Sequence, residues 1–246
     1  IMEFIGNTAL IDAVIVVLSW VVLFSRKPKG EEVGAKNNYL SQYFVATFAF
    51  LVLIAFTILR TEGVTQQVMF LISDLVLWVS LFIFILLMYA DTKGTGKGMM
   101  MLAFGIFALA RSLFQLAGIV GMDLSGLGET TLYVLSQLDA WLMYAVWVPS
   151  ALVLIYVALT SESNIVRFRS LVFAIGLLLI SFTWAFRLLS ASTVSVQTAY
   201  LLVGGLSVVG FFLLLVGILY KGQNKMQTDG MSMNTQMGNT NPPQMQ

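Results

Sequence analysis

The chain has 246 residues, of which 59% are apolar and 10% are charged, and its mean hydropathy is +0.90. A soluble protein carries about 25% charged residues, so this chain has too few charges to cover a globular surface. Its formal net charge of +1 gives no indication of a nucleic-acid partner.

Cysteine and histidine are both missing from the sequence. Without cysteine there can be no disulfide, thiolate metal site or thiol nucleophile. Without histidine there can be no imidazole-ligated haem or zinc and no His-dependent catalytic triad. We therefore expect no metal site, no cofactor and no enzymatic activity.

Long apolar runs follow one another along the chain, and each approaches or exceeds the roughly 20 residues that a helix needs to cross a bilayer. We predict an all-α, polytopic membrane protein: one domain of seven transmembrane helices over 1–220, then a disordered polar tail over 221–246. The helices are predicted at 5–25, 39–60, 67–90, 98–120, 131–158, 168–189 and 196–220.

The first three predicted helices carry one strongly polar residue each. The first contains Asp12, and its acidic start at Glu3 argues against a cleavable signal peptide. The second ends at Arg60, whose side chain can extend to the membrane surface. The third contains Asp74 close to its beginning.

The fourth predicted helix contains Arg111 in the middle of its apolar run. A charge at the bilayer centre costs about 2.5–3.5 kcal/mol on insertion scales, so we expect Arg111 to face the bundle interior with a carboxylate or water. Gln115 follows four residues later on the same helical face. Gly121 and Gly128 are expected to end this helix.

The fifth predicted helix has the densest set of polar and aromatic side chains. Gln137, Trp141 and Tyr144 follow one helical face, with Asp139 beside them. These residues could line a pocket, although aromatic packing in the core is the more common role. Pro149 lacks a backbone N–H and predicts a kink; a gating hinge is the second interpretation.

The last two predicted helices complete the pattern. The sixth contains Arg187 near its end. The seventh has small residues near helical spacing, which favour close helix packing, with a substrate path as the alternative. These residues are Gly204, Ser207, Gly210 and Gly217.

The tail over 221–246 is polar, low in complexity and rich in methionine, including Met231 and Met233. Such a composition predicts disorder. Thioether ligands suit Cu(I), but a solvated tail without metal is the favoured interpretation. The chain shows no soluble effector domain, so we expect a protein partner or a second copy.

The positive charges fall almost entirely on one side of the predicted helices. Ten Lys and Arg residues lie in the loops after the first, third and fifth helices and in the tail, whereas Arg60 alone lies on the other side. The positive-inside rule then places the N-terminus outside and the C-terminus in the cytoplasm of a multi-pass protein of the cell membrane.

The charged residues within the helices alternate in sign. Asp12, Asp74 and Asp139 lie early in odd-numbered helices, and Arg residues lie late in even-numbered ones. This pattern is typical of a weak repeat of helical hairpins, although convergent composition could produce part of it.

Residue counting from the basic loops gives each charge a depth in the bilayer. Arg111 lies 14 residues beyond Lys97 and Asp12 lies 14 before Arg26, so both are about 21 Å from the cytoplasmic loops at 1.5 Å per residue. The match makes Asp12 the first expected partner of Arg111 and Asp74 the second.

Two interpretations of this Asp and Arg core remain open. It could be polar glue between helices, or it could line an outer cavity for a small ligand, ion or proton. The leading functional prediction is a non-catalytic sensor, receptor-like module or complex subunit within the lipid bilayer. The alternative is a small transporter or channel for protons, ions or a small solute.

Seven helices with this orientation resemble the topology of microbial rhodopsins. In that family retinal is attached to a lysine inside the last helix, and no lysine lies within any predicted helix here. The resemblance is therefore limited to topology, and we expect no retinal.

Overall fold

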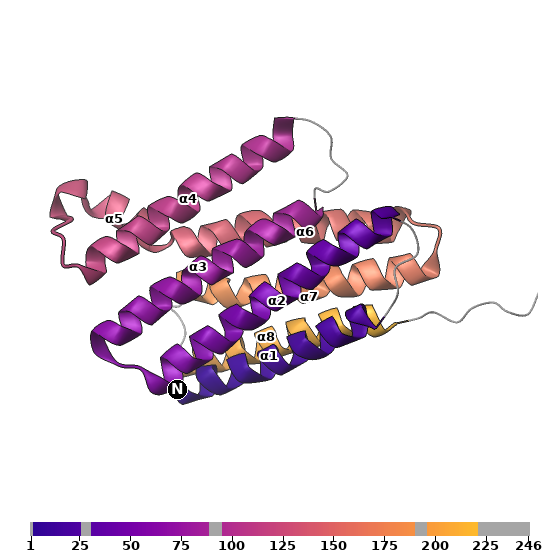
Figure 1. Cartoon of the computed structure of the whole chain (residues 1–246), viewed down its shortest axis with the longest axis horizontal. Helices are drawn as coiled ribbons and strands as arrows, with labels where there is room; N and C mark the ends of the chain where they lie inside the picture. The colour runs from indigo at the N-terminus through magenta and orange to yellow at the C-terminus, as the bar shows by residue number, and fades with distance from the viewer. Residues whose placement is uncertain (1, 26–30, 89–94, 190–195, 221–246) are drawn as a thin grey trace, which may run out of the picture.

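The computed structural model describes the backbone of residues 2–25, 31–88, 95–189 and 196–220, and the side chains of 3–25, 38–88, 98–182, 198 and 201–220. These residues form α-helices, one short 3-10 turn and their connections (Figure 1). The elements are α1 (Met2–Phe24), α2 (Glu31–Arg60), α3 (Gly63–Met88), α4 (Thr95–Ile119), η1 (Ser125–Leu127), α5 (Glu129–Ser136), α6 (Leu138–Thr160), α7 (Asn164–Leu189) and α8 (Val196–Leu219).

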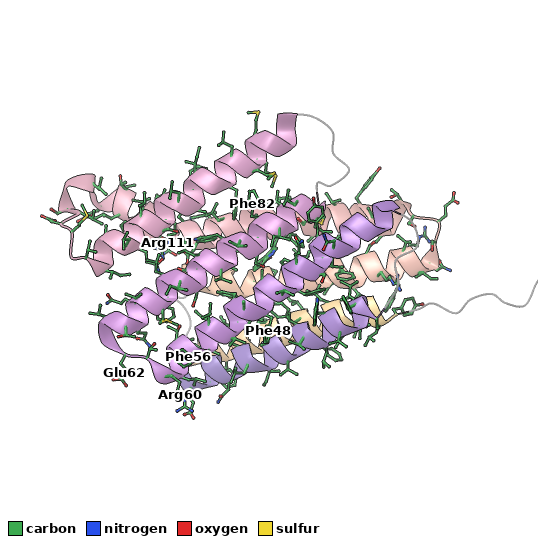
Figure 2. All side chains as sticks on the ribbon, in the orientation of Figure 1. Phe48, Phe56, Arg60, Glu62, Phe82 and Arg111 are labelled. Carbon is green, nitrogen blue, oxygen red and sulfur yellow. The ribbon has the colours of Figure 1, made fainter. Side chains whose placement is uncertain are left out.

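Within the described residues, seven of these helices are long and apolar enough to cross a membrane, all except α5. This confirms the all-helical prediction and the predicted number of helices of membrane-spanning length. Large apolar side chains also cover the outside of the bundle, such as Phe48 and Phe56 on α2 (Figure 2), which are 38% and 51% exposed. An apolar exterior of this kind is what a bundle surrounded by lipid requires.

Six of the long helices form a closed ring. Each of α1, α2, α3, α6, α7 and α8 contacts the next in this order, and α1 contacts α8 to close the ring. In Figure 1 the N-terminus of α1 lies at the same end of the bundle as the turn between α2 and α3 and the connection through α5. We call this end of the bundle the N-terminal end; at the opposite end α1 and α3 end and α2, α4 and α7 begin, so the sequence connections rich in Lys and Arg belong to that end.

Helix α4 packs against the outside of the ring, where it contacts α3 and α6. It is the least buried of the seven long helices. Its buried stripe is Phe104, Ala108 and Ser112, one residue per turn. The Phe104 ring meets Trp78 of α3 edge to face, with ring centroids 6.2 Å apart.

The connection from α4 to α6 corrects the predicted fifth helix. Gly121 has φ 72°, and the Met122 N–H donates to the Ala117 carbonyl, so α4 ends in a Schellman motif. The chain then forms η1 and α5, and the helix breaks at Gln137, which has φ −101° and ψ 1°. The single helix predicted over 131–158 is therefore two helices, because Gln137 takes turn geometry and α6 restarts directly after it.

The same connection holds an exposed carboxylate. The Ser125 backbone N–H donates to Asp123 Oδ1 at 2.9 Å. This hydrogen bond stabilises the ionised form and lowers the pKa of Asp123 below its usual value.

Small residues on α8 allow close helix packing on two sides. A Cβ added at Gly204 would lie 2.8 Å from Phe4 of α1, and one at Gly210 would lie 2.9 Å from the Gly176 carbonyl of α7. Gly217 also faces α7, where Phe173 lies 3.0 Å from its added Cβ. The small residues predicted as one packing face therefore serve two neighbouring helices.

Two further features concern α6 to α8. Helix α6 continues through Pro149 without a break, and the kink or hinge there stays a prediction.

Arg169, at the start of α7, donates from Nε to the Tyr220 carbonyl at 2.9 Å, and the Phe168 and Tyr220 rings lie 4.2 Å apart. These contacts fasten the end of α8 to α7.

Candidate functional site

Most buried hydroxyl groups of the described chain are satisfied within their own helix. Ser19, Ser73 and Ser181, for example, each donate at 2.8 Å to the backbone carbonyl four residues earlier. Such local bonds hide a polar group without needing a neighbouring helix. Polar side chains that reach across helices, or that lack a partner, are therefore the exceptions that define a candidate site.

A central cavity of about 240 Å³ lies inside the six-helix ring. Its wall is mostly apolar and aromatic, and all six helices of the ring contribute to it. The polar residues of the wall are Thr8, Asp12, Tyr43, Thr47, Ser80 and Ser207, and its other aromatic residues are Phe50, Phe70, Trp147 and Phe211.

Asp12 is the one charged residue among the described residues that line this cavity. The whole Asp12 residue is only 2% exposed. The Ser207 hydroxyl donates to Asp12 Oδ2 at 2.5 Å, which links α8 to α1. Asp12 Oδ1 is closed to water and has no hydrogen-bond partner in the described part of the chain. An ionised carboxylate in this position has one oxygen uncompensated, which is costly in an apolar interior.

A second interhelical hydrogen bond lies in the same wall. The hydroxyl groups of Thr47 on α2 and Ser80 on α3 are 2.8 Å apart. Tyr43, one turn earlier on α2, is 3% exposed and packs against Phe84 with ring centroids 4.9 Å apart. These contacts fix the α2 and α3 sides of the cavity.

A layer of buried apolar side chains from the hydrophobic core borders the cavity wall. Each of its members lies three or four residues from a residue of the cavity wall on the same helix, and each is between 0% and 3% exposed. We call this layer the apolar floor; it comprises Val16, Phe44, Leu81, Ala151, Leu177 and Leu214, one from each helix of the ring.

A second cavity of about 390 Å³ lies where α4 crosses α3 and α6. Arg111 of α4 faces Asp139 of α6 there, with Arg111 Nε 3.9 Å from Asp139 Oδ1. Their side chains are 14% and 8% exposed, and the Arg111 guanidinium lies 5.9 Å from the centre of the Phe114 ring. Asp74 and Gln115 complete the polar lining with Gln67, and Gln115 Oε1 has no hydrogen-bond partner in the described region.

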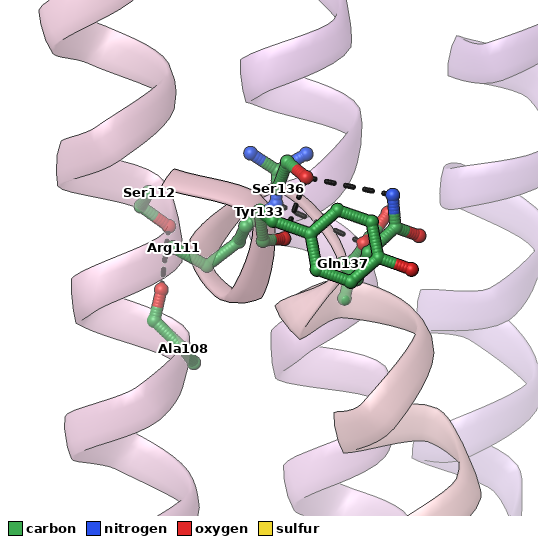
Figure 3. A network of polar contacts seen from close by, with 7 residues as sticks. Ala108, Arg111, Ser112, Tyr133, Ser136 and Gln137 are labelled. Carbon is green, nitrogen blue, oxygen red and sulfur yellow. Dashed lines mark hydrogen bonds and ion pairs between the residues drawn. The ribbon is translucent and has the colours of Figure 1, made fainter. Parts of the chain in front are cut away.

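Figure 2 shows Arg111 between α4 and the ring, whereas Arg60 lies at the end of the bundle. Figure 3 shows Arg111 together with Ser136 and Gln137 of the junction between α5 and α6. The break between these helices therefore lies next to the ion pair.

The expected pairing of Arg111 with Asp12 is corrected by this geometry. Asp139 is the carboxylate that faces Arg111, and α4 has no contact with α1 among the described residues. The depth match failed because equal depth does not make two helices neighbours. Asp74, the second expected partner, lines the same cavity as Arg111.

The two cavities share a wall. Phe50 and Ile54 of α2 and Phe70 of α3 line both of them. Three apolar side chains that line both cavities thus stand between the mixed charges of Asp74, Arg111 and Asp139 and the single charge of Asp12.

Other predicted site residues lie elsewhere. Trp141 is 56% exposed and lines neither cavity, so it lies on the outside of the bundle. Tyr144 and Gln137 are half-buried, and neither lines a cavity. Arg187 belongs to α7, but its side chain lies outside the described residues, as does the tail over 221–246.

Most residues of the central cavity could not be singled out from the sequence. On α6 the buried face is Asp139, Met143 and Trp147, at four-residue spacing, and the last two are 0% and 5% exposed. Trp147 is the member of this face that lines the central cavity. The four-residue spacing can be seen in the sequence. The sequence favours the competing face of Gln137, Trp141 and Tyr144 instead, because that face carries more polar and aromatic side chains. Thr47 and Ser80 carried no sequence signal, since isolated hydroxyl residues are common in apolar helices.

The fold and these cavities define a class: a bundle of seven helices of membrane-spanning length with two polar sites between helices. Comparison with protein-family models, with curated proteins and with solved structures gives no match for this chain. The functional argument therefore rests on the geometry of the sites.

Proposed function

We propose that this chain is a multi-pass protein of the cell membrane that binds a small ligand in its central cavity. It would act as a non-catalytic sensor or receptor-like module and pass the binding event to a partner protein or a second copy. The positive-inside rule supports an outside N-terminus, because the basic loops lie at the opposite end of the bundle. The cavity would then lie in the outer half of the bilayer.

The observation that carries this proposal is the apolar floor beneath the cavity. Each ring helix contributes a side chain that is at most 3% exposed, and a packed apolar layer offers no hydrogen bonds to water or ions. A binding site that is closed on its cytoplasmic side favours ligand recognition over continuous conduction. Helix movements around an occupied cavity could then carry the signal.

The second candidate is a small transporter or channel for protons, ions or a small solute. The observation that favours it is the wall that the two polar cavities share, since Phe50, Ile54 and Phe70 line both of them. Intramembrane ionisable residues commonly mark such pathways. The mixed charge of Asp74, Arg111 and Asp139 argues against a simple ion pore, since charged selectivity rings use one sign.

A flux assay distinguishes the two candidates. The full chain is reconstituted into liposomes that contain a pH-sensitive dye, and proton and Na⁺ gradients are imposed. We expect fluxes equal to those of protein-free liposomes, with an ionophore added last to show that the vesicles are sealed. Flux above this background that Asp12→Asn abolishes would instead establish the transporter.

A further inference from the structure

We propose that the central cavity binds a small organic cation, a primary ammonium ion whose charged group pairs with Asp12 and whose hydrocarbon part packs against the aromatic wall. This inference rests on the proposed function, which requires a ligand in this cavity, and it names the chemical class of that ligand.

Charge is the first argument. The described wall of the central cavity contains one carboxylate and neither Lys nor Arg. Ser207 supplies Asp12 with one hydrogen bond, and Oδ1 has no partner within the described chain. When the Asp12 side chain turns Oδ1 toward the cavity, an ammonium N–H would supply the missing donor and neutralise the buried charge. The second cavity differs, because its wall already contains a cation, Arg111, which faces Asp139.

The wall is the second argument. Five aromatic residues line the cavity, from α2, α3, α6 and α8. Aromatic faces attract organic cations, and the attraction increases when water is excluded. The five residues are Tyr43, Phe50, Phe70, Trp147 and Phe211.

Size and lining together favour an amine over a bare metal ion. The volume of about 240 Å³ is below the roughly 300–1,000 Å³ of pockets for drug-sized ligands, so the ligand must be small. A hard cation needs about six oxygen ligands around it. The wall presents one carboxylate with scattered hydroxyls, and the remaining apolar surface suits a hydrocarbon chain.

The test uses the full chain in nanodiscs and n-propylammonium chloride as the probe. Binding is followed by calorimetry and by tryptophan fluorescence, since Trp147 lines the cavity. The titration extends to about 50 mM, because a ligand of so few atoms binds in the micromolar to millimolar range. The comparison probes are 1-propanol, which has the same shape without charge, and sodium chloride, which supplies a cation without hydrocarbon.

We expect saturable binding of propylammonium alone. Asp12→Asn should weaken it about tenfold or more, because a charge-assisted hydrogen bond and the ion pairing are both lost. Asp123→Asn removes the same charge from the exposed connection after α4 and should leave the affinity unchanged. Thermal unfolding of each variant shows whether it is folded, and Trp147→Leu, which keeps the carboxylate, should weaken binding several-fold.

The inference would be overturned by no saturation with propylammonium, by equal saturation with 1-propanol, or by unchanged affinity in folded Asp12→Asn. Binding of Na⁺ in place of propylammonium would also overturn it and assign an inorganic ion to Asp12. The proposed function is tested separately, because ion flux in the liposome assay would reject it. If the liposomes show no flux and the nanodiscs show no amine binding, only the ammonium ligand is rejected.

Discussion

Asp12 and Arg111 are both buried charges inside an apolar bundle, but their surroundings differ. Arg111 has Asp139 at 3.9 Å and the Phe114 ring beneath its guanidinium. Asp12 has a single hydroxyl donor and one oxygen with no partner in the described chain. Arg111 therefore has a carboxylate facing it, whereas Asp12 is the residue that an added cation would stabilise.

Removal of the Ser207 hydroxyl tests the interhelical bond to Asp12. Ser207→Ala should lower the free energy of unfolding by about 1–3 kcal/mol, because a buried carboxylate oxygen loses its donor. Ser181→Ala is the matched control, since Ser181 donates only to the Leu177 carbonyl of its own helix and its loss should change stability by about 0.5 kcal/mol or less. Equal effects in thermal unfolding would contradict the special role of Ser207.

A double-mutant cycle tests the Arg111 and Asp139 pair. Arg111→Gln and Asp139→Asn should each destabilise the bundle, and the double variant should lose less than their sum by about 0.5–3 kcal/mol. The control cycle combines Arg111→Gln with Asp12→Asn, which lie on helices without contact. The effects of these two substitutions on stability should add within about 0.5 kcal/mol. Coupling between Arg111 and Asp12, with none between Arg111 and Asp139, would instead support the Arg111–Asp12 pairing expected from depth.

At the scale of the elements, hydrophobic run lengths were sufficient to predict the helices. The connection through α5 was not predictable in this way, because residues on both sides of Gln137 are apolar enough to continue one helix. The order of the helices around the ring was also hidden. The length of an apolar run and the charge of the loops predict the direction of a helix and the depth of its residues in the bilayer. Which helices pack together depends on close contacts such as that of Gly176 with Gly210.

Helix α8 offers a matched pair of glycines that tests its packing. A Cβ at Gly210 would lie 2.9 Å from the Gly176 carbonyl, whereas one at Gly205 would have nothing within 4 Å. Gly210→Ala should therefore lower the free energy of unfolding by about 1–3 kcal/mol through forced separation of α7 and α8. Gly205→Ala should be neutral or slightly stabilising, and a loss of stability as large as that of Gly210→Ala would refute the packing account.

At the scale of the whole molecule, the bundle is a six-helix ring around a polar cavity, with α4 attached outside. The alternation of Asp and Arg predicted a polar core from the sequence. It did not predict that the core divides into two cavities, because Phe50, Ile54 and Phe70 are ordinary apolar residues in their helices. The apolar floor was hidden for the same reason, since its members differ from other apolar residues only in what surrounds them.

The central claim is that the apolar floor separates the central cavity from the end of the bundle with the basic loops. The chain contains no cysteine, so single substitutions give unique labels for a small, membrane-impermeant thiol reagent. Thr8→Cys places a thiol in the cavity, Ala151→Cys in the floor, and Ser19→Cys on the side of the floor toward the basic loops.

The measurement is the labelling rate of each variant in sealed, oriented vesicles, with reagent added to one side at a time. We predict that the Thr8→Cys thiol reacts only with reagent added at the N-terminal end of the bundle, and that the Ala151→Cys and Ser19→Cys thiols react from neither side. Labelling of the floor, or of Thr8→Cys from the side of the basic loops, would show a water path through the bundle and contradict the closed cavity.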